Sequence, residues 1–247
     1  MSDDAIPAAT LVVWRDGPAK PEILVVERSA RMAFAAGAIV FPGGRIDAAD
    51  RELAEACGQP DQAAKISAIR ETIEESGVVA GLTGPIDAAL GLKLQSALNE
   101  GADFGELLTA NVLTLDLDAL TAFARWMPAF KQPRKFDTLF FLARAPAGDW
   151  PPNPQAGECV AAEWANPADL LDRISRGLAS AIFPTKRNLE RLASHESLDA
   201  ALADARVHSL ETIIPWVEEI DGEPHVRIPK DRGYPITAEP LATAFRA

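Results

Sequence analysis

Short apolar runs separated by turn residues open the chain and predict β-strands. Residues 10–14 and 22–27 are apolar and rich in β-branched side chains, and the Asp-Gly-Pro of 16–18 between them supplies turn chemistry. A third run, residues 38–41, ends at the Pro-Gly-Gly of 42–44. The beginning of the chain therefore predicts three strands joined by tight connections.

After Asp61 the spacing of the apolar residues changes to that of a helix. Apolar residues gather on one side of the segment that follows, and Gly77 offers a left-handed helix stop. Residues 46–62 before it are polar and alanine-rich and indicate no clear element, whereas residues 78–82 suit a strand. We therefore expect one helix that ends at Gly77.

The rest of the chain mixes helical and extended patterns. Asp221-Gly222 is a strong signal for a two-residue hairpin turn. This order of elements predicts an α+β fold, with helices packed on both faces of a mixed β-sheet. We expect one domain over residues 1–247, because no linker or repeat divides it. Helices are predicted within residues 85–124 (two or three), 166–174 and 184–193, and strands at 136–144, 160–164, 213–220 and 225–228.

Charge and composition exclude several classes of partner. A net charge of -12 argues against a nucleic acid or an anionic membrane as the main partner, although it leaves room for a small phosphorylated substrate. No apolar run approaches the roughly 20 residues of a membrane span. The acidic Met1-Ser2-Asp3-Asp4 resembles no targeting segment, and Cys57 and Cys159 suggest reduced thiols, so we expect a cytoplasmic protein.

Three glutamates gather near the end of the helix before Gly77. Glu71, Glu74 and Glu75 are spaced i, i+3 and i+4, which places their carboxylates on one side. Each like-charge pair costs roughly 0.2–0.5 kcal/mol, and the negative end of the helix dipole disfavours them further. A bound cation would compensate this repulsion, and hard oxygen ligands favour Mg²⁺ or Mn²⁺ over zinc. A solvated acidic helix end is the alternative.

The surrounding motif resembles a known family. The Gly43-Gly44 pair, followed after a gap by the sequence RETIEESGV (70–78), resembles the Nudix box, Gx5Ex7REUxEExGU, in which U is aliphatic. The resemblance implies a Nudix-type α/β/α sandwich with inserted and C-terminal helices. It also implies a diphosphatase that hydrolyses a nucleoside diphosphate linked to another group. Its metal ligands would be Glu71, Glu74, Glu75 and the Gly43 carbonyl, with Arg70 orienting the acids.

The box departs from the family pattern in its spacing. Arg70 follows Gly44 by 26 positions (70 − 44) rather than the 14 of the pattern, an insertion of 12 at about residues 50–61. The first acid of the box could therefore be Asp50 or Asp61, or it could be replaced by Gln62. We expect the box to span residues 44–78, a helical insert to span about 85–124 and a C-terminal helical extension to span about 166–206.

The flanks resemble the coenzyme A diphosphatase branch of the family. Arg28-Ser29, Gly37 and the FPGG of 41–44 keep the spacing of the sequence that precedes the box there, although Ala33 stands where that branch has an arginine. Residues 124–143 are similar to a further block of the branch. This resemblance implies coenzyme A or acyl-coenzyme A as the substrate. The alternatives are a diphosphatase for ADP-ribose or NADH, and a non-catalytic Nudix module that senses a ligand.

Several other side chains are candidates for the same site. Arginine suits bidentate phosphate binding, and an aromatic ring can stack on a base, although surface charge and core packing are the competing interpretations. Glu158 lies where Nudix enzymes often place an acid opposite the box, so either Glu71 or Glu158 could take the proton from water. We expect a nucleotide diphosphate substrate and allow for a homodimer. The substrate-binding candidates are Arg28, Arg31, Arg45, Arg134 and Phe136.

Overall fold

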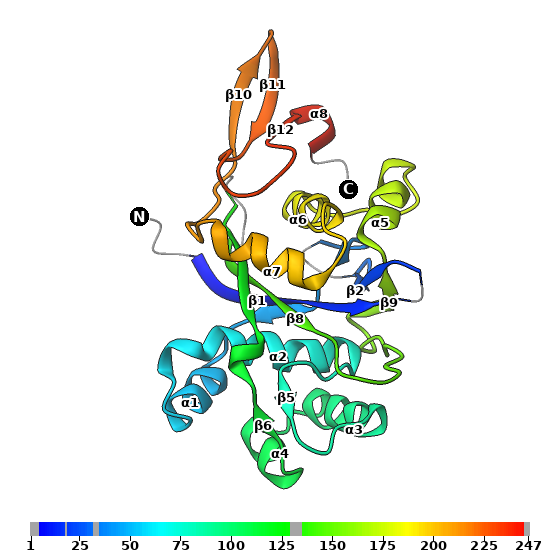
Figure 1. Ribbon diagram of the computed structural model, residues 1–247, viewed down its shortest axis with the longest axis vertical. Helices are drawn as coiled ribbons and strands as arrows, with labels where there is room; N and C mark the ends of the chain where they lie inside the picture. Colours follow the sequence, from blue (N-terminus) through cyan, green and yellow to red (C-terminus); the bar gives the residue numbers. More distant parts are fainter. Residues whose placement is uncertain (1–4, 18, 32–34, 129–134, 245–247) are drawn as a thin grey trace.

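A mixed β-sheet forms the centre of the molecule (Figure 1). The computed structural model describes residues 5–17, 19–31, 35–128 and 135–244. The strands run in the order β3-β2-β1-β8-β7, while β4 pairs with β1 and β9 pairs with β2. The strands are β1 (Ala5–Asp16), β2 (Pro21–Arg28), β3 (Ile39–Val40), β4 (Gly43–Arg45), β7 (Thr121–Trp126), β8 (Lys135–Arg144) and β9 (Cys159–Ala165).

The strand β1 is central to this sheet because it pairs with three others. It runs parallel to β8 over ten residue pairs, from Ala5↔Lys135 to Trp14↔Arg144. Its pairings with β2 and β4 are antiparallel, as are those of β7 with β8 and of β9 with β2. The expected mixed sheet is therefore confirmed.

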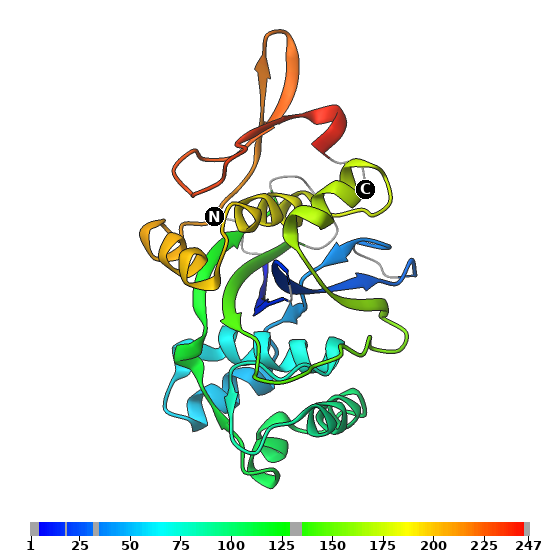
Figure 2. The same ribbon diagram turned by 45° about the vertical axis from the view of Figure 1, so that its right-hand side comes forward.

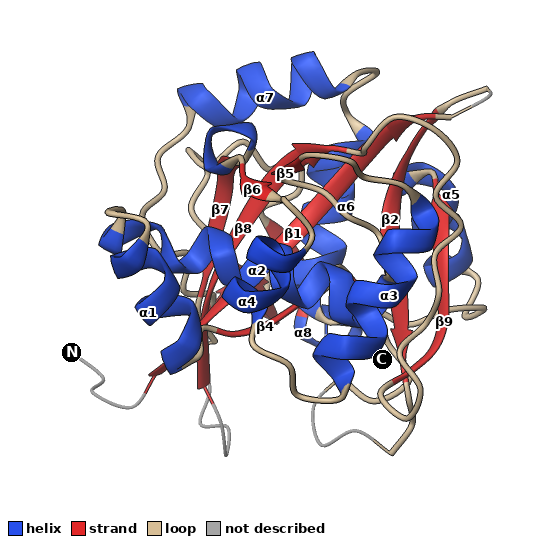
Figure 3. Cartoon of the chain, turned by 90° about the horizontal axis from the view of Figure 1, so that it is seen from below, coloured by secondary structure: helices blue, strands red, loops and turns tan. Residues whose placement is uncertain are grey.

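Helices cover both faces of the sheet, as expected. In Figure 1 the helices α1, α2 and α3 lie on one face and α6 and α7 on the other, and Figure 3 shows α2, α3 and α4 lying across the strands. The helices of the first face are α1 (Ala48–Ala56), α2 (Ala63–Ser76), α3 (Ala88–Asn99) and α4 (Phe104–Ala110), with 3₁₀ turns at Pro60–Gln62 and Leu117–Ala119. The others are α5 (Pro167–Ser175), α6 (Phe183–Ala193), α7 (Leu198–Val207) and α8 (Leu241–Ala244).

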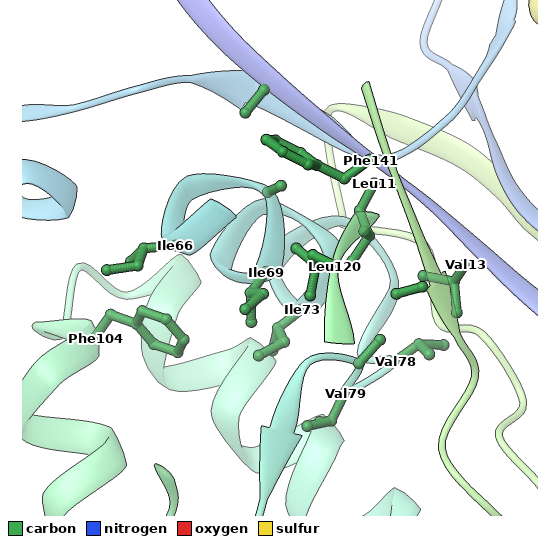
Figure 4. Close-up of a cluster of buried hydrophobic side chains, with 14 of the residues drawn as sticks. Leu11, Val13, Ile66, Ile69, Ile73, Val78, Val79, Phe104, Leu120 and Phe141 are labelled. Atoms are coloured by element: carbon green, nitrogen blue, oxygen red, sulfur yellow. The ribbon is translucent and has the colours of Figure 1, made fainter. Parts of the chain in front are cut away.

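Each face of the sheet has its own hydrophobic core. Because side chains alternate along a strand, Leu11 and Val13 of β1 pack toward α2, whereas Val12 and Trp14 belong to the core under α6 and α7. Figure 4 shows Leu11 and Val13 in the same cluster of buried side chains as Ile69 and Ile73 of α2. A strand buried on both faces explains why its sequence reads as a continuous apolar run.

Two small sheets complete the chain. The first consists of β5 (Leu82–Thr83) and β6 (Thr114–Leu115). The second contains β10 (Trp216–Ile220), β11 (Glu223–Arg227) and β12 (Ala238–Pro240), and its β10–β11 hairpin projects from the body in Figures 1 and 2. The turn of that hairpin is Asp221-Gly222, as predicted. Within the described ranges, no helix has the length and apolar character that crossing a membrane requires.

Three local predictions are wrong. Residues 46–62 include the helix α1, which starts at a capping box formed by Asp47 and Asp50 and continues through alanines that favour helix. The helical interpretation of 85–124 fails at its end, because residues from Thr121 onward join β8 as strand β7. The strand predicted at 78–82 is found only as the two-residue strand β5 at 82–83. Gly77 and Gly81 take positive φ, which interrupts an extended backbone before it.

Polar side chains buried on α6 attach the second small sheet. Arg187 donates to Glu239 of β12 at 2.7 Å, and Arg191 donates to Asp204 of α7 at 2.7 Å. Tyr234 links this region to the central sheet, because its hydroxyl accepts from Trp126 Nε1 at 2.9 Å. These contacts hold the C-terminal part of the chain on the face opposite α2.

Candidate active site

The acidic side chains lie on the last turns of α2, beside β4. The helix ends where Gly77 takes a φ of 69° and its N–H bonds to the Ile73 carbonyl. Thr72 and Ser76 are fully buried and donate to the Ala68 and Thr72 carbonyls, which satisfies their hydroxyls within the helix. The apolar side of α2 is thus fixed in the core, and its acidic side faces the Gly43–Arg45 strand.

Arg70 is the centre of the ionic network on this side. Its Nε and Nη2 donate to the two carboxylate oxygens of Asp50, each at 2.9 Å, in a buried bidentate pair. Its Nη1 lies 3.0 Å from Oε1 of Glu74 and 3.0 Å from Oε1 of Glu71. Arg70 therefore contacts two acids of α2 as well as Asp50, and its role in orienting the acids stays a prediction.

The partner of Arg70 is Asp50, one of the three positions that the insertion leaves open for the first acid of the box. Asp50 is 2% exposed and lies in α1, six positions after Gly44 (50 − 44). Asp61 is exposed in the 3₁₀ turn before α2, and Gln62 ends that turn. If Asp50 is the first acid of the box, the additional residues form the rest of α1 and the turn.

Replacing Asp50 with asparagine is expected to lower the free energy of unfolding by about 2–4 kcal/mol. The change leaves the buried guanidinium of Arg70 without its bidentate partner, and a broken buried ion pair costs about 3–5 kcal/mol when nothing replaces it. Urea unfolding measures the difference. Asp61→Asn, which removes the same charge at an exposed site, should change it by less than about 0.5 kcal/mol. Equal stabilities for the two variants would contradict the assignment of Asp50.

Glu75 occupies the most enclosed position of the acidic cluster. It is 2% exposed, its Oε2 accepts from the Gly43 N–H at 3.1 Å, and its Oε1 lies 3.4 Å from Nη1 of Arg28. Burial, and then the charge of Glu71, raise the pKa of Glu75 to about 8 against the opposing effects of Arg28 and Gly43. Its negative charge is therefore incompletely compensated by the protein.

The other two glutamates share this deficit of positive charge. Burial raises the pKa of Glu71 to about 7, although Arg70 opposes the shift. Burial also raises the pKa of Glu74, again against Arg70. One arginine thus serves three carboxylates, counting Asp50, and the cluster would be stabilised by a further cation.

The two glycines of β4 let the strand approach these carboxylates closely. A Cβ on Gly44 would lie closer than 3.0 Å to the carboxylate atoms of Glu71. A Cβ on Gly43 would meet Thr10 and the Ala9 carbonyl of β1 at similarly short distances. The backbone of β4 is therefore part of the site, and both positions require glycine for space rather than for an unusual φ.

The donors of this cluster suit a hard divalent cation. In the described part of the chain, no group of three or more His, Cys, Asp or Glu side chains is arranged to hold a metal ion. Glu71 and Glu74 turn to Arg70, and Glu75 turns to Gly43 and Arg28. All the candidate donors are oxygens, and burial raises the pKa values of Glu71 and Glu75, so the residues suit a hard divalent cation.

The substrate-binding candidates are found in different surroundings. Arg28 lies in the site, beside Glu75. Arg31 is exposed in the following loop, and the Arg45 side chain is 63% exposed and 3.9 Å from Asp47. Phe136 is half-buried on β8 opposite Ile6. Arg134 lies outside the described residues.

Glu158 is exposed, just before β9, and is close enough for its charge to raise the pKa of Glu75. Its backbone carbonyl accepts from the Ser29 N–H at 2.7 Å, which ties the start of β9 to the loop after β2. The site thus brings together the box helix, β4 and the Arg28–Ser29 region.

Cys159 is a neighbour of the site that the sequence did not indicate. It is buried beside Glu75 and Arg28, and burial, then the charge of Glu75, raise the pKa of its thiol to about 12. It therefore stays protonated and apolar at neutral pH. The sequence held one indication of this position: Cys159 directly follows Glu158, and a residue next to a candidate acid at the start of a strand lies near the same site.

Comparison with known proteins places this fold and site in one family. No family model matches the chain. The crystal structure of a Nudix hydrolase from Alicyclobacillus acidocaldarius is 31% identical and has a TM-score of 0.70, covering 85% of this chain and 99% of its own. The human acyl-coenzyme A diphosphatase NUDT19 is 27% identical over 86% of this chain and 72% of its own length. Its counterpart from Gallus gallus is 25% identical over 81% and 68% respectively.

These matches confirm the predicted sandwich fold, the expectation of a Nudix diphosphatase, and the resemblance to the coenzyme A diphosphatase branch. They extend over most of the chain. Together with the buried glutamates of α2 and the glycines of β4, they lead to one conclusion. The chain belongs to the Nudix hydrolase family.

Proposed function

We propose that this protein hydrolyses the pyrophosphate bond of coenzyme A or an acyl-coenzyme A in the presence of Mg²⁺ or Mn²⁺. The observation that carries the proposal is the burial of Glu71 and Glu75 against the glycine strand β4, with raised pKa values for both. Carboxylates held at such a cost in free energy need a cationic partner. A substrate that arrives with a divalent cation provides one.

The residues of the chain have distinct parts in this proposal. Glu71 and Glu75 would hold the cation with help from Glu74 and the Gly43 carbonyl, while Arg70 keeps the acids in position. A bound divalent cation neutralises phosphate oxygens and lowers the pKa of water. Glu75 is aligned for this by the Gly43 N–H, which fixes one of its two oxygens.

Two carboxylates could accept the proton from the attacking water. Glu71 is half-buried beside β4, on the helix that would hold the cation, and so would lie close to a water bound there. Glu158 is exposed and can pass a proton to solvent. We propose both as candidates for the base.

Coenzyme A is favoured as the substrate by the similarity to the human acyl-coenzyme A diphosphatase over 86% of this chain. Arg28-Ser29, Gly37 and the FPGG of 41–44 add a local resemblance to that branch. An ADP-ribose or NADH diphosphatase would use the same helix with a different pocket. A module that only senses its ligand is disfavoured, because all three glutamates of the box helix remain.

A substrate panel tests this proposal. Coenzyme A, an acyl-coenzyme A, ADP-ribose and NADH are compared by kcat/KM with Mg²⁺ and with Mn²⁺, and the products are separated by chromatography. We expect the coenzyme A compounds to be cleaved at the pyrophosphate, giving 3′,5′-ADP and a 4′-phosphopantetheine species, at least about tenfold more efficiently than the others. A tenfold difference corresponds to about 1.4 kcal/mol in the transition state. A preference for ADP-ribose or NADH would overturn the choice of substrate.

The metal proposal also predicts how stability depends on pH. Because the folded pKa values of Glu71 and Glu75 are raised to about 7 and 8, the folded chain binds more protons than the unfolded chain above about pH 4.5. The stability of the metal-free protein should therefore fall as pH rises toward 8. Mn²⁺ should raise Tm more at pH 8.5 than at pH 6, because protons compete with the cation. An equal rise at both values, measured by scanning calorimetry, would contradict the ligand assignment.

A further inference from the structure

Arg28 is placed at the site by the backbone of three strands. It is the last residue of β2, its N–H donates to the Ala38 carbonyl at 3.0 Å, and its carbonyl accepts from the Gly37 N–H at 3.0 Å. Opposite it on β9 the register shifts, so that Cys159 is its partner and Val160 is an additional residue. Arg28 shares a face of β2 with Leu24, which packs toward α2, so its side chain points to the box helix.

The guanidinium of Arg28 is held much more weakly than that of Arg70. Its contact with Glu75 is a single one, at 3.4 Å, whereas Arg70 makes two bonds of 2.9 Å with Asp50. Its Nε is buried and has no hydrogen-bond partner among the described residues. A guanidinium carries five N–H donors in a planar fork that matches a phosphate. Most of the N–H donors of Arg28 are therefore not used by Glu75.

Glu75 is contacted by Arg28 at Oε1, one of the oxygens that a cation would need. Its other oxygen already accepts from the Gly43 N–H. A cation and Arg28 therefore compete for the same carboxylate. The side chain of Arg28 is 15% exposed, so a substrate phosphate bound to a cation at Glu75 would come within its reach. Among the residues that the structure describes, the guanidinium of Arg28 gives up a single long contact when it leaves.

We propose that Arg28 changes partners during the reaction cycle. It pairs with Glu75 while no cation is bound, and it turns its fork to the substrate's diphosphate once a divalent cation has taken Glu75. The inference rests on the proposed metal site and adds an order of events to it. Arg28 would thus keep the empty site stable and become a substrate ligand only in the metal-loaded protein.

The first test measures Mn²⁺ binding without substrate, by titration calorimetry. Arg28→Gln removes the positive charge that competes with the cation for Glu75. Mn²⁺ binding should therefore tighten by about fivefold or more. Arg28→Lys keeps the charge and should stay within about twofold of the unchanged protein. Arg15→Gln is the matched control: Arg15 pairs with Glu22 at 2.7 Å, and Glu22 is six residues, or about 20 Å, from Arg28 along β2. Its effect should be negligible.

The second test separates a change of partner from a simple loss of charge. The probe is α,β-methylene-ADP, a diphosphate with no cleavable bridge, and its Kd is measured with and without Mn²⁺. Arg28→Gln should weaken probe binding about tenfold with Mn²⁺, the value of a charged hydrogen bond, and by less than about twofold without it. Equal weakening in both conditions would show a permanent phosphate ligand and overturn the inference.

Failure of the metal site itself has a different signature. If the unchanged protein binds no Mn²⁺, or if Glu75→Gln binds it equally well, the proposed function fails together with the inference. If Glu75→Gln weakens Mn²⁺ binding but Arg28→Gln fails to tighten it, only the change of partner is wrong.

Discussion

Replacing Glu75 with glutamine is expected to reduce kcat by roughly two orders of magnitude or more, in line with the several kcal/mol that a catalytic metal supplies. The glutamine keeps the volume and can still accept from the Gly43 N–H that holds Glu75 at 3.1 Å. It removes the charge that would bind the cation. The loss should therefore appear in turnover with Mg²⁺ while the fold stays intact by circular dichroism.

The matched control for this variant is Glu55→Gln. Glu55 lies exposed on α1 and carries the same charge on the same face of the sheet. Its replacement should leave kcat within about twofold, as is usual for surface substitutions. Full activity in Glu75→Gln would remove Glu75 from the set of metal ligands and would shift that role to Glu71.

Replacing Gly44 with alanine is expected to lower kcat by about 10²-fold. The added methyl would lie closer than 3.0 Å to the carboxylate of Glu71, so either the carboxylate or β4 must move. A displacement of about 1 Å in a catalytic group can cost this much. The folded chain should lose about 1–3 kcal/mol of stability as well, the usual cost of overpacking. Kinetics with saturating substrate and urea unfolding measure the two effects.

Gly105→Ala provides the comparison. A Cβ there would meet nothing closer than 3.1 Å, and the position is within α4, away from the acidic cluster. Alanine favours a helix over glycine by about 1 kcal/mol, which offsets the close contact with Leu53, so this variant should stay within about 1 kcal/mol in stability and retain its activity. Wild-type turnover in Gly44→Ala would mean that Glu71 has no fixed position in catalysis.

The sequence predicted the part of the site that depends on local spacing. Glu71, Glu74 and Glu75 share a side of α2 because three- and four-residue steps return to the same face of any helix. Gly77 could be recognised as the stop for the same local reason. These features require no knowledge of what packs against the helix.

Contacts between distant segments could not be predicted in this way. Counting along the chain led to Asp50 or Gln62, with Asp61 as a third candidate, and only the packing of α1 beside α2 shows that Asp50 is the partner of Arg70. The pairing of Arg28 with Glu75 spans 47 positions and depends on where β2 ends over the box helix. The leucine and alanine spacing before Ala124 resembled a helix, but β8 offered a ladder to residues 121–126, and tertiary pairing outweighs propensity.

The parallel pairing of β1 with β8 has a consequence for synthesis. Ala5 of β1 pairs with Lys135, which is 130 positions later (135 − 5). At about 5–20 residues per second, the ribosome takes roughly 6–26 s to deliver that partner. During this time the apolar β1 has one edge unpaired, an arrangement that is prone to aggregation. The nascent chain cannot close its central sheet before β8 emerges, so its yield in cells should depend on chaperones that shield β1 during translation.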